Sequence, residues 1–348
     1  MIYKILCLGN QWRGSDDGSL FNAFSRSGHI ISIIDHKMFI SSEDLSYKSK
    51  TINKIFKSFF LSDFNKQIIK HITLIKPDIV CVYKGNCIFP ETLDQIKKCG
   101  IPIFCVYPDV SFFDHESNIP KLIPYYDHIF TTKSFGVKDL KNIFNFTNVS
   151  VIKHSIDPNI HRKINLEKDE FSHFVNDVSF IGSYSRKKED LINSIINIDN
   201  IEIKIWGGSW NSSKNIAVKS KYMNTSVLGD EYTIAIQKSK INLGILFEGS
   251  KSSSSGDLIT SRTFHIPGAG GFMLHERTDE LLEVFKEGVS VVCFENKEEL
   301  NNKIKYYLKN ESARDKIALK SYDLVWKYHK SDDRAKEIIE ILKINNFL

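Results

Sequence analysis

Short apolar runs alternate with helix-like segments along this chain, and this alternation constrains the fold more than any other feature. It is typical of parallel β-sheets whose two faces are covered by helices. In the first half the runs predict six strands, at residues 3–8, 30–34, 79–83, 103–107, 128–131 and 149–153. Apolar residues at helical spacing predict a helix over 54–75, and a proline at the first position predicts a short helix over 90–98.

The alternation begins again in the second half, after a polar segment at 157–175 that has no clear period. Six more strands are predicted at 178–181, 201–206, 226–228, 241–245, 271–274 and 291–294, followed by three helices from residue 297 onward. A length of 348 residues also favours two domains over one. We therefore expect an α/β protein with domains at 1–160 and 161–335 and a closing helix at 336–348.

Composition excludes several protein classes. The chain is 42% hydrophobic and 26% charged, as in globular rather than disordered proteins. No apolar run approaches the roughly 18 residues that span a bilayer, and the start lacks a signal-peptide pattern, so we expect a cytoplasmic protein. The six cysteines show neither zinc nor redox spacing, which predicts reduced thiols that lie mostly in the core.

Charge gives weaker information about partners. The formal net charge of +5 is spread along the chain, which does not indicate nucleic-acid binding. A mildly basic surface suits anionic phosphates or peripheral contact with the inner membrane surface, and it equally suits a solvated lysine-rich exterior. These interpretations, and the oligomeric state, stay open at this point.

Ligands of open parallel sheets bind beyond the carboxyl ends of the strands, so the loops that follow strands are the first places to search. One such loop contains Gly14, Asp16 and Asp17, after the first predicted strand. Its glycines permit tight turns, and an aspartate could anchor a polar acceptor there. The same loop could equally form the capped start of a helix.

A second loop, after the strand at 178–181, contains Gly182, Ser183, Arg186 and Lys187. A glycine turn, a helix N-terminus and cations together suit a pyrophosphate. The helix end supplies only about 0.3–1 kcal/mol, so the cations would have to provide most of the attraction. The alternative is that these cations lie on the solvated surface of a helix.

The segment 257–276, DLITSRTFHIPGAGGFMLHE, is the most informative in the chain. Here Arg262, His265, Gly268, Gly270 and Gly271 are predicted to surround a helix N-terminus that leads into a buried strand. Polar groups and outward-facing backbone N–H groups at such a place suit a nucleotide or its phosphates. A helix cap with a tight packing turn would explain the pattern as well.

Several segments resemble one known family in their order and spacing. They are DVSFIGSYSRKKEDLI, IKIWGGSW, SKINLGI and SRTFHIPGAGGFMLHERTDELLEVFKEGVSVVCFENKEEL, over residues 175–335. They resemble the CgeB-like (spore maturation protein) glycosyltransferases with a family-one-type C-terminal domain. Upstream, VYPDVSFF, YYDHIFTTK and HSIDPNIHR are similar to the same family. The resemblance implies a GT-B fold, in which two Rossmann-like domains with parallel sheets face each other across a cleft.

The resemblance also implies roles for particular residues. The first domain would hold the acceptor and the second the donor, and the closing helix would cross back to the first. Asp257 and His265 fall at the acidic positions of an E-x7-E pattern, near the donor sugar and the ribose respectively. An imidazole binds a hydroxyl less strongly than a carboxylate does, which weakens the ribose assignment of His265. The positions that match donor-binding segments of the family are Gly182, Ser183, Arg186, Lys187, Trp206, Gly207, Arg262, Gly268, Gly270, Gly271 and Phe272.

In the first domain, Asp109 and His154 lie at or just beyond predicted strand ends, so they are candidate catalytic residues, with packing or capping as the alternative. Cations and N–H groups can neutralise a leaving diphosphate without a metal, and the sequence has no D-x-D pair. We therefore expect a metal-independent and retaining glycosyltransferase without a cofactor.

Its donor substrate would be a nucleotide-diphosphate sugar, its acceptor a glycan or a lipid-linked glycan, and its pathway cell-surface polysaccharide or glycoconjugate biosynthesis. The alternatives are a GT-B-like sugar-nucleotide epimerase and a non-catalytic sugar-nucleotide-binding protein. The departure at His265 is what favours the non-catalytic alternative.

Overall fold

The structure is a computed structural model that describes residues 1–39, 47–114, 117–167, 170–250 and 252–348. The chain forms two compact units. Unit 1 consists of Met1–Lys153, Gly249–Ser255 and Ser331–Leu348, and unit 2 of His154–Glu248 and Gly256–Lys330. The predicted boundaries at 160/161 and 335/336 therefore lie seven and five residues from those of the structure, at 153/154 and 330/331.

Unit 1 is built on a six-stranded parallel sheet in the order β2-β1-β3-β4-β5-β6. Each of the six predicted strands is present. They are β1 (Lys4–Leu8), β2 (Ile30–Ile34), β3 (Ile79–Tyr83), β4 (Ile103–Tyr107), β5 (His128–Thr131) and β6 (Val149–Val151). Because β2 and β3 lie on opposite sides of β1, the chain reverses its direction of winding between β1 and β3.

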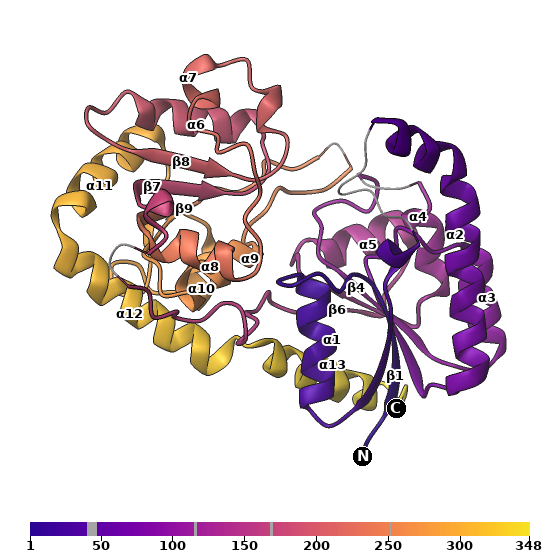
Figure 1. The fold of residues 1–348 in the computed structure, drawn as a ribbon. Helices are drawn as coiled ribbons and strands as arrows, with labels where there is room; N and C mark the ends of the chain where they lie inside the picture. The colour runs from indigo at the N-terminus through magenta and orange to yellow at the C-terminus, as the bar shows by residue number, and fades with distance from the viewer. Residues whose placement is uncertain (40–46, 115–116, 168–169, 251) are drawn as a thin grey trace. The chain divides into compact units, whose positions relative to one another are not determined.

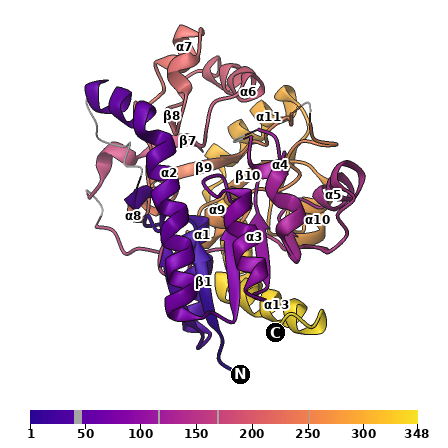
Figure 2. The ribbon, with the colours of Figure 1, turned by 90° about the vertical axis from the view of Figure 1, so that its right-hand side faces the viewer.

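Helices cover both faces of this sheet (Figures 1 and 2). They are α1 (Asp16–Arg26), α2 (Tyr47–Ile75), α3 (Pro90–Lys98), α4 (Ile119–Leu122), α5 (Gly136–Phe144) and α13 (Ser331–Ile344), with short 3-10 turns at His36–Met38 and Ile123–Tyr125. Alternate residues of β1 enter two separate cores, as the period of a strand requires. Leu6 packs with α2 to α5, whereas Ile5 packs with α1 and α13.

Unit 2 contains a five-stranded parallel sheet in the order β11-β10-β9-β7-β8. Its strands are β7 (Asn176–Ile181), β8 (Ile203–Trp206), β9 (Ser239–Gly244), β10 (Met273–Glu276) and β11 (Val292–Phe294). The predicted strand at 226–228 is wrong. The edge of β8 pairs instead with residues 221–225, through the bonds Ile205 N to Lys221 O and Gly207 N to Thr225 O, and Val227 enters the core beside Trp206.

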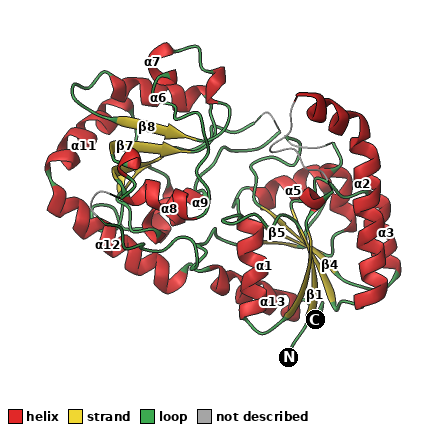
Figure 3. Cartoon of the chain, in the orientation of Figure 1, coloured by secondary structure: helices red, strands yellow, loops and turns green. Residues whose placement is uncertain are grey.

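The helices of unit 2 also flank its sheet, as the red and yellow elements of Figure 3 show. They are α6 (Arg186–Ile196), α7 (Ile216–Lys219), α8 (Asp230–Gln237), α9 (Ser261–Gly268), α10 (Asp279–Val284), α11 (Lys297–Lys309) and α12 (Glu311–Tyr328), with 3-10 turns at Ser172–Phe174 and Trp210–Ser212. Side-chain oxygens cap several helix starts, as their sequences suggest: Ser185 accepts from Lys188 N in α6, and Thr278 accepts from Leu281 N in α10.

The described part of the predicted linker at 157–175 belongs to unit 2. Ile156 N donates to His329 O at 2.8 Å, and the Thr233 hydroxyl donates to Ile160 O at 2.8 Å. The three predicted closing helices are present as α11, α12 and α13, and the last of these packs beside α1 in unit 1. Residues near 160 are therefore part of the scaffold of the second sheet.

The cysteines are free thiols in the part of the chain that the structure describes. Cys7, Cys81, Cys105 and Cys293 are buried as predicted, whereas Cys99 is exposed. Among the described residues, no helix combines the length and the apolar character that crossing a membrane requires.

Candidate functional site

The carboxyl ends of β7 and β9 form the place in unit 2 where a ligand site is expected. The chain passes from β7 to β8 on one side and then to β9 on the other, so the sheet reverses its winding between β7 and β9. In open parallel sheets ligands bind at this reversal, because the loops on its two sides diverge. The loops concerned begin at Gly182, after β7, and at Ile245, after β9.

Two glycines make a close backbone approach at this edge. Gly207 has φ = +127°, and a Cβ there would lie 2.4 Å from Gly182 O. A Cβ on Gly182 would lie 2.6 Å from Nη1 of Arg262. The Trp210 indole donates to Gly182 O at 2.8 Å. Gly182 and Gly207 are therefore required by packing, and their contacts let a cationic side chain lie directly on the end of β7.

Arg262, in the first turn of α9, bridges the two strands. Its Nη2 donates to Ile245 O at 2.8 Å, and its guanidinium lies 5.1 Å from the ring centre of Phe180. Its Nε is enclosed and has no hydrogen-bond partner among the described residues. Burial lowers the pKa of Arg262, and the charges of Tyr232, Asp257 and Glu276 act in the opposite direction. The side chain is fixed by its neighbours, and no ion pair with a described residue neutralises it.

Lys188, in the first turn of α6, supplies a second enclosed cation. It is 5% exposed, its Nζ donates to Ser183 O at 3.0 Å, and the ammonium lies 5.7–5.8 Å from the ring centres of Phe180 and Phe247. Burial, and next the positive charge of Arg262, lower its pKa to about 8 against the opposing charges of Asp257 and Glu248. Two cations that repel each other where water is largely excluded favour an anionic ligand over a neutral one.

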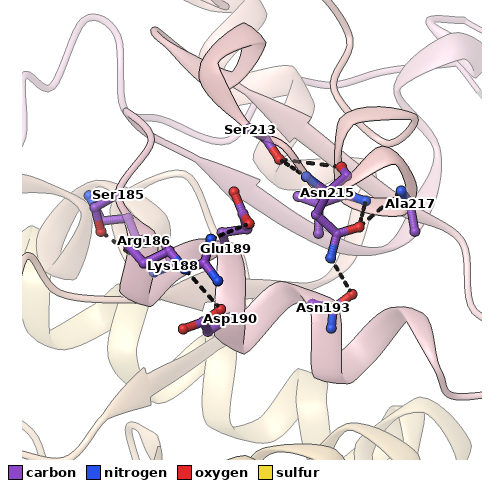
Figure 4. Close-up of polar contacts among 10 residues, drawn as sticks. Ser185, Arg186, Lys188, Glu189, Asp190, Asn193, Ser213, Asn215 and Ala217 are labelled. Carbon is purple, nitrogen blue, oxygen red and sulfur yellow. Dashed lines mark hydrogen bonds and ion pairs between the residues drawn. The ribbon is translucent and has the colours of Figure 1, made fainter.

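The two cations predicted from the sequence are more exposed than Lys188, and their roles stay predictions. Arg186 is 70% exposed and pairs along its own helix with Glu189 and Asp190 (Figure 4). Lys187 pairs with Glu276 at 2.8 Å. Sequence reasoning missed Lys188, although a signal existed: Leu191, Ile192 and Ile195 define the buried face of α6, and Lys188 precedes Leu191 by three positions on that face.

Polar contacts fix the first turn of α6 and the loop beside it. The Ser185 hydroxyl donates to Glu248 at 2.8 Å, which ties the start of α6 to the segment after β9. Farther along, the Asn193 side chain accepts from Asn215, whose own oxygen caps α7 (Figure 4). The exposed Ser183 lies in this ordered turn. Hydrogen bonds that do not involve Lys188 or Arg262 therefore fix the backbone around the candidate site.

The predicted ribose contact, His265, lies in a stack of rings. Its imidazole lies 3.7 Å from that of His161, centre to centre and nearly parallel, and Tyr232 meets both rings edge-on. His265 Nε2 donates to Ser155 O at 3.1 Å, so this nitrogen already has a partner. Burial and the neighbouring His265 lower the pKa of His161 well below its usual value. The contact between His265 and a ribose stays a prediction. It would have to use an atom of the stacked rings other than Nε2 of His265.

The glycines of the third loop have a different position from the predicted one. Helix α9 begins at Ser261, so Gly268, Gly270 and Gly271 lie at its end. A Cβ on Gly268 would lie 2.5 Å from Ile156, one on Gly270 2.7 Å from Lys163, and one on Gly271 2.5 Å from Ile236. The prediction that they surround a helix N-terminus is therefore wrong, because they lie at the C-terminal end of α9 and just after it. There a Cβ would collide with neighbouring residues of the same unit.

Two predicted aromatic contacts are core side chains. Phe272 is 3% exposed and packs against Tyr307, with ring centres 4.9 Å apart. Trp206 is 2% exposed beneath Phe174, and only its carbonyl, which accepts from Gly182 N, takes part in the edge. Asp257 does belong to the edge, because its charge acts on both Lys188 and Arg262.

Of the remaining candidates, Asp17 and Asp109 lie in unit 1 and His154 lies in unit 2. The Asp17 carboxylate accepts from Asn10 N and Gly18 N, so it fixes its own loop, and Ser15 caps α1. Asp109 forms an ion pair with Lys84. His154 is 8% exposed and belongs to unit 2.

Asp16 opens α1, and Gly14 precedes it with φ = +94°. Among the described residues, no group of three His, Cys, Asp or Glu side chains is placed to hold a metal ion, and metal independence stays a prediction.

Comparison with known proteins bears on what this edge does. Residues 186–340, under half of the chain, match a family described as glycosyl transferase-like. This matched segment holds α6, α9 and both enclosed cations. A comparison with curated proteins found no sequence match.

Several solved structures share the fold over nearly the whole chain. An alpha-glucosyltransferase in complex with UDP and DNA is 13% identical, with a TM-score of 0.68, and the match covers 99% of this chain and 100% of that one. The Anabaena protein HepE in complex with UDP-glucose is 11% identical, with a TM-score of 0.64 and coverages of 98% and 99%. A Listeria monocytogenes protein assigned as a UDP-N-acetylglucosamine 2-epimerase is 12% identical, with a TM-score of 0.57 and coverages of 100% and 97%.

These likenesses confirm the predicted fold class, two Rossmann-like α/β domains with parallel sheets, as in GT-B glycosyltransferases. Together with the family match they support a glycosyltransferase-type enzyme. Identity with CgeB-like proteins in particular stays a prediction.

Proposed function

We propose that this chain transfers a sugar from a nucleotide-diphosphate sugar to a hydroxyl acceptor, and that Lys188 and Arg262 hold the diphosphate. One observation carries the proposal. Lys188 is buried and Arg262 is half-buried with its Nε inaccessible, both at the point where the second sheet reverses its winding, and among the described residues neither forms an ion pair. A desolvated positive charge that is not paired with a negative charge costs free energy, which a bound anion would recover.

The chemistry of sugar transfer suits this arrangement. Negative charge develops on the diphosphate as the anomeric bond breaks, and preorganised cations stabilise it most where water is excluded. The guanidinium of Arg262 can donate two parallel hydrogen bonds to a phosphate, and Lys188 adds a point charge. No step in this account uses a metal. Two similar structures are complexes with UDP or UDP-glucose, which supports a sugar nucleotide as the substrate here.

Retention of anomeric configuration, a glycan or lipid-linked acceptor and a role in cell-surface polysaccharide biosynthesis remain parts of the proposal. A sugar-nucleotide epimerase is the second candidate, because a protein assigned that activity shares the fold. The family match over residues 186–340 favours transfer.

A binding experiment on the full chain tests the donor site. UDP, GDP, ADP and dTDP are added separately, and the melting temperature is recorded. One diphosphate at 100 times its dissociation constant should stabilise the protein by about 2.7 kcal/mol. Lys188→Met should abolish most of this stabilisation, and Arg186→Met, its exposed neighbour on the same helix, should preserve it. Stabilisation by none of the four, or an unaffected Lys188→Met variant, would contradict the proposal.

A second experiment identifies the reaction. The sugar nucleotide of the preferred base is incubated with the protein, with and without a glycan acceptor, and the products are separated. Transfer predicts a glycosylated acceptor and free diphosphate, whereas epimerisation predicts a new sugar nucleotide and no acceptor product. Activity that EDTA removes and manganese restores would refute metal independence.

A further inference from the structure

A histidine near the end of β10 lies close to the donor edge and has no part in the site described above. His275 is fully buried, and its partners across the sheet are Gly244 in β9 and Cys293 in β11. A Cβ on Gly244 would lie 2.7 Å from Cγ of the imidazole and closer still to Cδ2. The ring therefore occupies the space that the absent side chain of Gly244 leaves.

Both ring nitrogens of His275 are hydrogen-bonded. Nδ1 lies 2.6 Å from the carbonyl oxygen of Glu276, and Nε2 lies 2.9 Å from the Thr263 hydroxyl. Because a carbonyl oxygen can only accept, Nδ1 carries the proton. Burial lowers the pKa of His275 to about 4, against the opposing effect of the bond to Glu276, so the ring is neutral at neutral pH. Nε2 is then an acceptor, and the Thr263 hydroxyl donates to it.

Thr263 joins this histidine to the start of α9. Its hydroxyl also accepts from Thr260 N at 3.0 Å, and Thr260 is the residue that precedes the helix. Thr263 is fully buried, as His275 is, so these bonds are shielded from water. A chain of hydrogen bonds therefore attaches the first turn of α9 to the end of β10.

Arg262 lies in the same turn, one position before Thr263. Its Nη2 donates to Ile245 O at 2.8 Å, one residue beyond Gly244. Adjacent residues of α9 thus meet adjacent residues at the end of β9, since the guanidinium bonds Ile245 and the threonine bonds the imidazole that lies on Gly244. A shift of this turn would move the guanidinium away from its anchor.

We propose that His275 is a positioning residue for Arg262: its imidazole holds Thr263, and through it the first turn of α9, so that the guanidinium is in place before a diphosphate binds. An anion binds more tightly to a group that does not have to be ordered on binding. The inference rests on the proposed function, in which the anion is a nucleotide diphosphate. Being fully buried, His275 does not touch this ligand itself.

Two substitutions at position 275 separate the two bonds of the ring. In His275→Gln the side-chain carbonyl lies where Nε2 was and still accepts from Thr263. In His275→Asn the shorter side chain can donate to Glu276 O and does not reach Thr263. Titration calorimetry on the full chain should give His275→Gln a UDP affinity within about threefold of the wild type, and His275→Asn one about tenfold lower. Equal affinities of the two variants, at either level, would overturn the proposal.

A second pair of variants serves if a change at position 275 prevents folding. Thr263→Val keeps the shape of the side chain and removes the hydroxyl, whereas Thr263→Ser keeps the hydroxyl. The first should weaken UDP binding about tenfold and the second less than about threefold. If both variants bind UDP as the wild type does, the hydroxyl does not position the turn and the proposal is wrong.

A buried histidine of unit 1 is the matched control. His128, in β5, is 4% exposed, its Nε2 lies 3.0 Å from the Ser150 hydroxyl, and burial lowers its pKa to about 4 as well. His128→Asn should lower the melting temperature and change UDP affinity less than twofold. A tenfold loss of affinity in this variant would assign the effect to general destabilisation and remove the specific role of His275.

A double-mutant cycle tests whether His275 acts through Arg262. In the background of Arg262→Met there is no guanidinium to position, so adding His275→Asn should change UDP affinity less than twofold. A purely structural histidine would lower stability in both backgrounds without this dependence of affinity. An undiminished tenfold effect would place the action of His275 elsewhere in the site and contradict the proposal.

NMR of the ligand-free chain, with ¹⁵N in the histidine and arginine side chains, separates this inference from the proposed function. His275 should be neutral and protonated at Nδ1, and the inaccessible Nε–H of Arg262 should exchange slowly with water. His275→Asn should speed this exchange and His275→Gln should not; unchanged exchange in His275→Asn would refute positioning. If the exchange responds and no nucleotide diphosphate binds, the proposed function fails and the positioning stands. If UDP binds equally to the wild type and His275→Asn, the reverse holds.

Discussion

The two sheets have the same winding and opposite chemistry at their switch points. In unit 1 the first strand lies between the second and the third, and in unit 2 β7 lies between β8 and β9 in the same way. At the first reversal a lysine is neutralised by an aspartate, with further carboxylates nearby. At the second, Lys188 is buried, Arg262 is half-buried, and their positive charges repel each other. Sheet topology therefore gives both units the same expected place for a ligand, and a few side chains give the two places different charges.

The two edges are also built by different devices. In unit 2, Gly207 lies against Gly182, and the absence of both Cβ atoms admits the guanidinium of Arg262. In unit 1, a strained turn at Lys84 projects a side chain across the sheet. The first device uses close backbone packing, and the second uses an unusual φ angle.

The largest expected effect concerns the close packing in unit 2. Gly207→Ala should lower the free energy of unfolding by about 3 kcal/mol or more, because φ is +127° and the new Cβ would meet Gly182 O at 2.4 Å. Gly100, in unit 1, has φ = +72° but open space around it, so Gly100→Ala should cost only about 1 kcal/mol. Thermal unfolding of both variants measures this, and equal stabilities would refute the close-packing argument.

Removal of the guanidinium should give the next largest effect. Arg262→Met should weaken UDP binding about 100-fold, since it removes charge-assisted hydrogen bonds that contribute about 1.5–3 kcal/mol each. Lys84→Met, at the edge of unit 1, should change UDP affinity less than twofold. Titration calorimetry on variants whose circular dichroism matches that of the wild type measures both. Similar losses in the two variants would erase the distinction between the edges.

The effect of pH on UDP affinity should be smaller than the effect of Arg262→Met. The pKa of Lys188 is lowered to about 8 in the free protein, and a bound diphosphate would raise it. Affinity should therefore be complete below pH 8 and fall as the pH rises above it, by up to about tenfold per unit until the pKa of the complex is reached. Above pH 7 the phosphate charge is constant, since it ionises near pH 6. Lys188→Met should flatten the profile, and an unchanged slope in that variant would assign the effect to another group.

The exposed cations should give the smallest effect. Lys187→Met should weaken UDP binding less than about threefold, because Lys187 already pairs with Glu276 at 2.8 Å and is 37% exposed. The same titration measures it beside Lys188→Met. A larger loss at position 187 than at 188 would restore the assignment made from sequence and contradict the one made from burial.

The sequence predicted the framework of the fold well and the site partly. Eleven strands lie at predicted places, because apolar runs of four to six residues carry their own signal; the twelfth prediction, at 226–228, was too short to distinguish a strand from a buried loop. The two segments expected to form the donor site do meet, at Gly182 and Arg262. The glycines at 268–271 were misplaced, since a glycine-rich turn has the same composition at either end of a helix.

The sequence by itself determined the two parallel sheets, the capped helices and the loops that carry the chemistry, because each depends on patterns that span only a few neighbouring residues. Only the tertiary structure decided which cation of the run Arg186–Lys188 is enclosed and that the guanidinium of Arg262 lies on Gly182, 80 positions away in the chain. It alone also paired Lys84 with Asp109, and stacked His161 on His265. Burial and charge pairing arise between residues distant in the chain, and local sequence carries no record of which of them will meet.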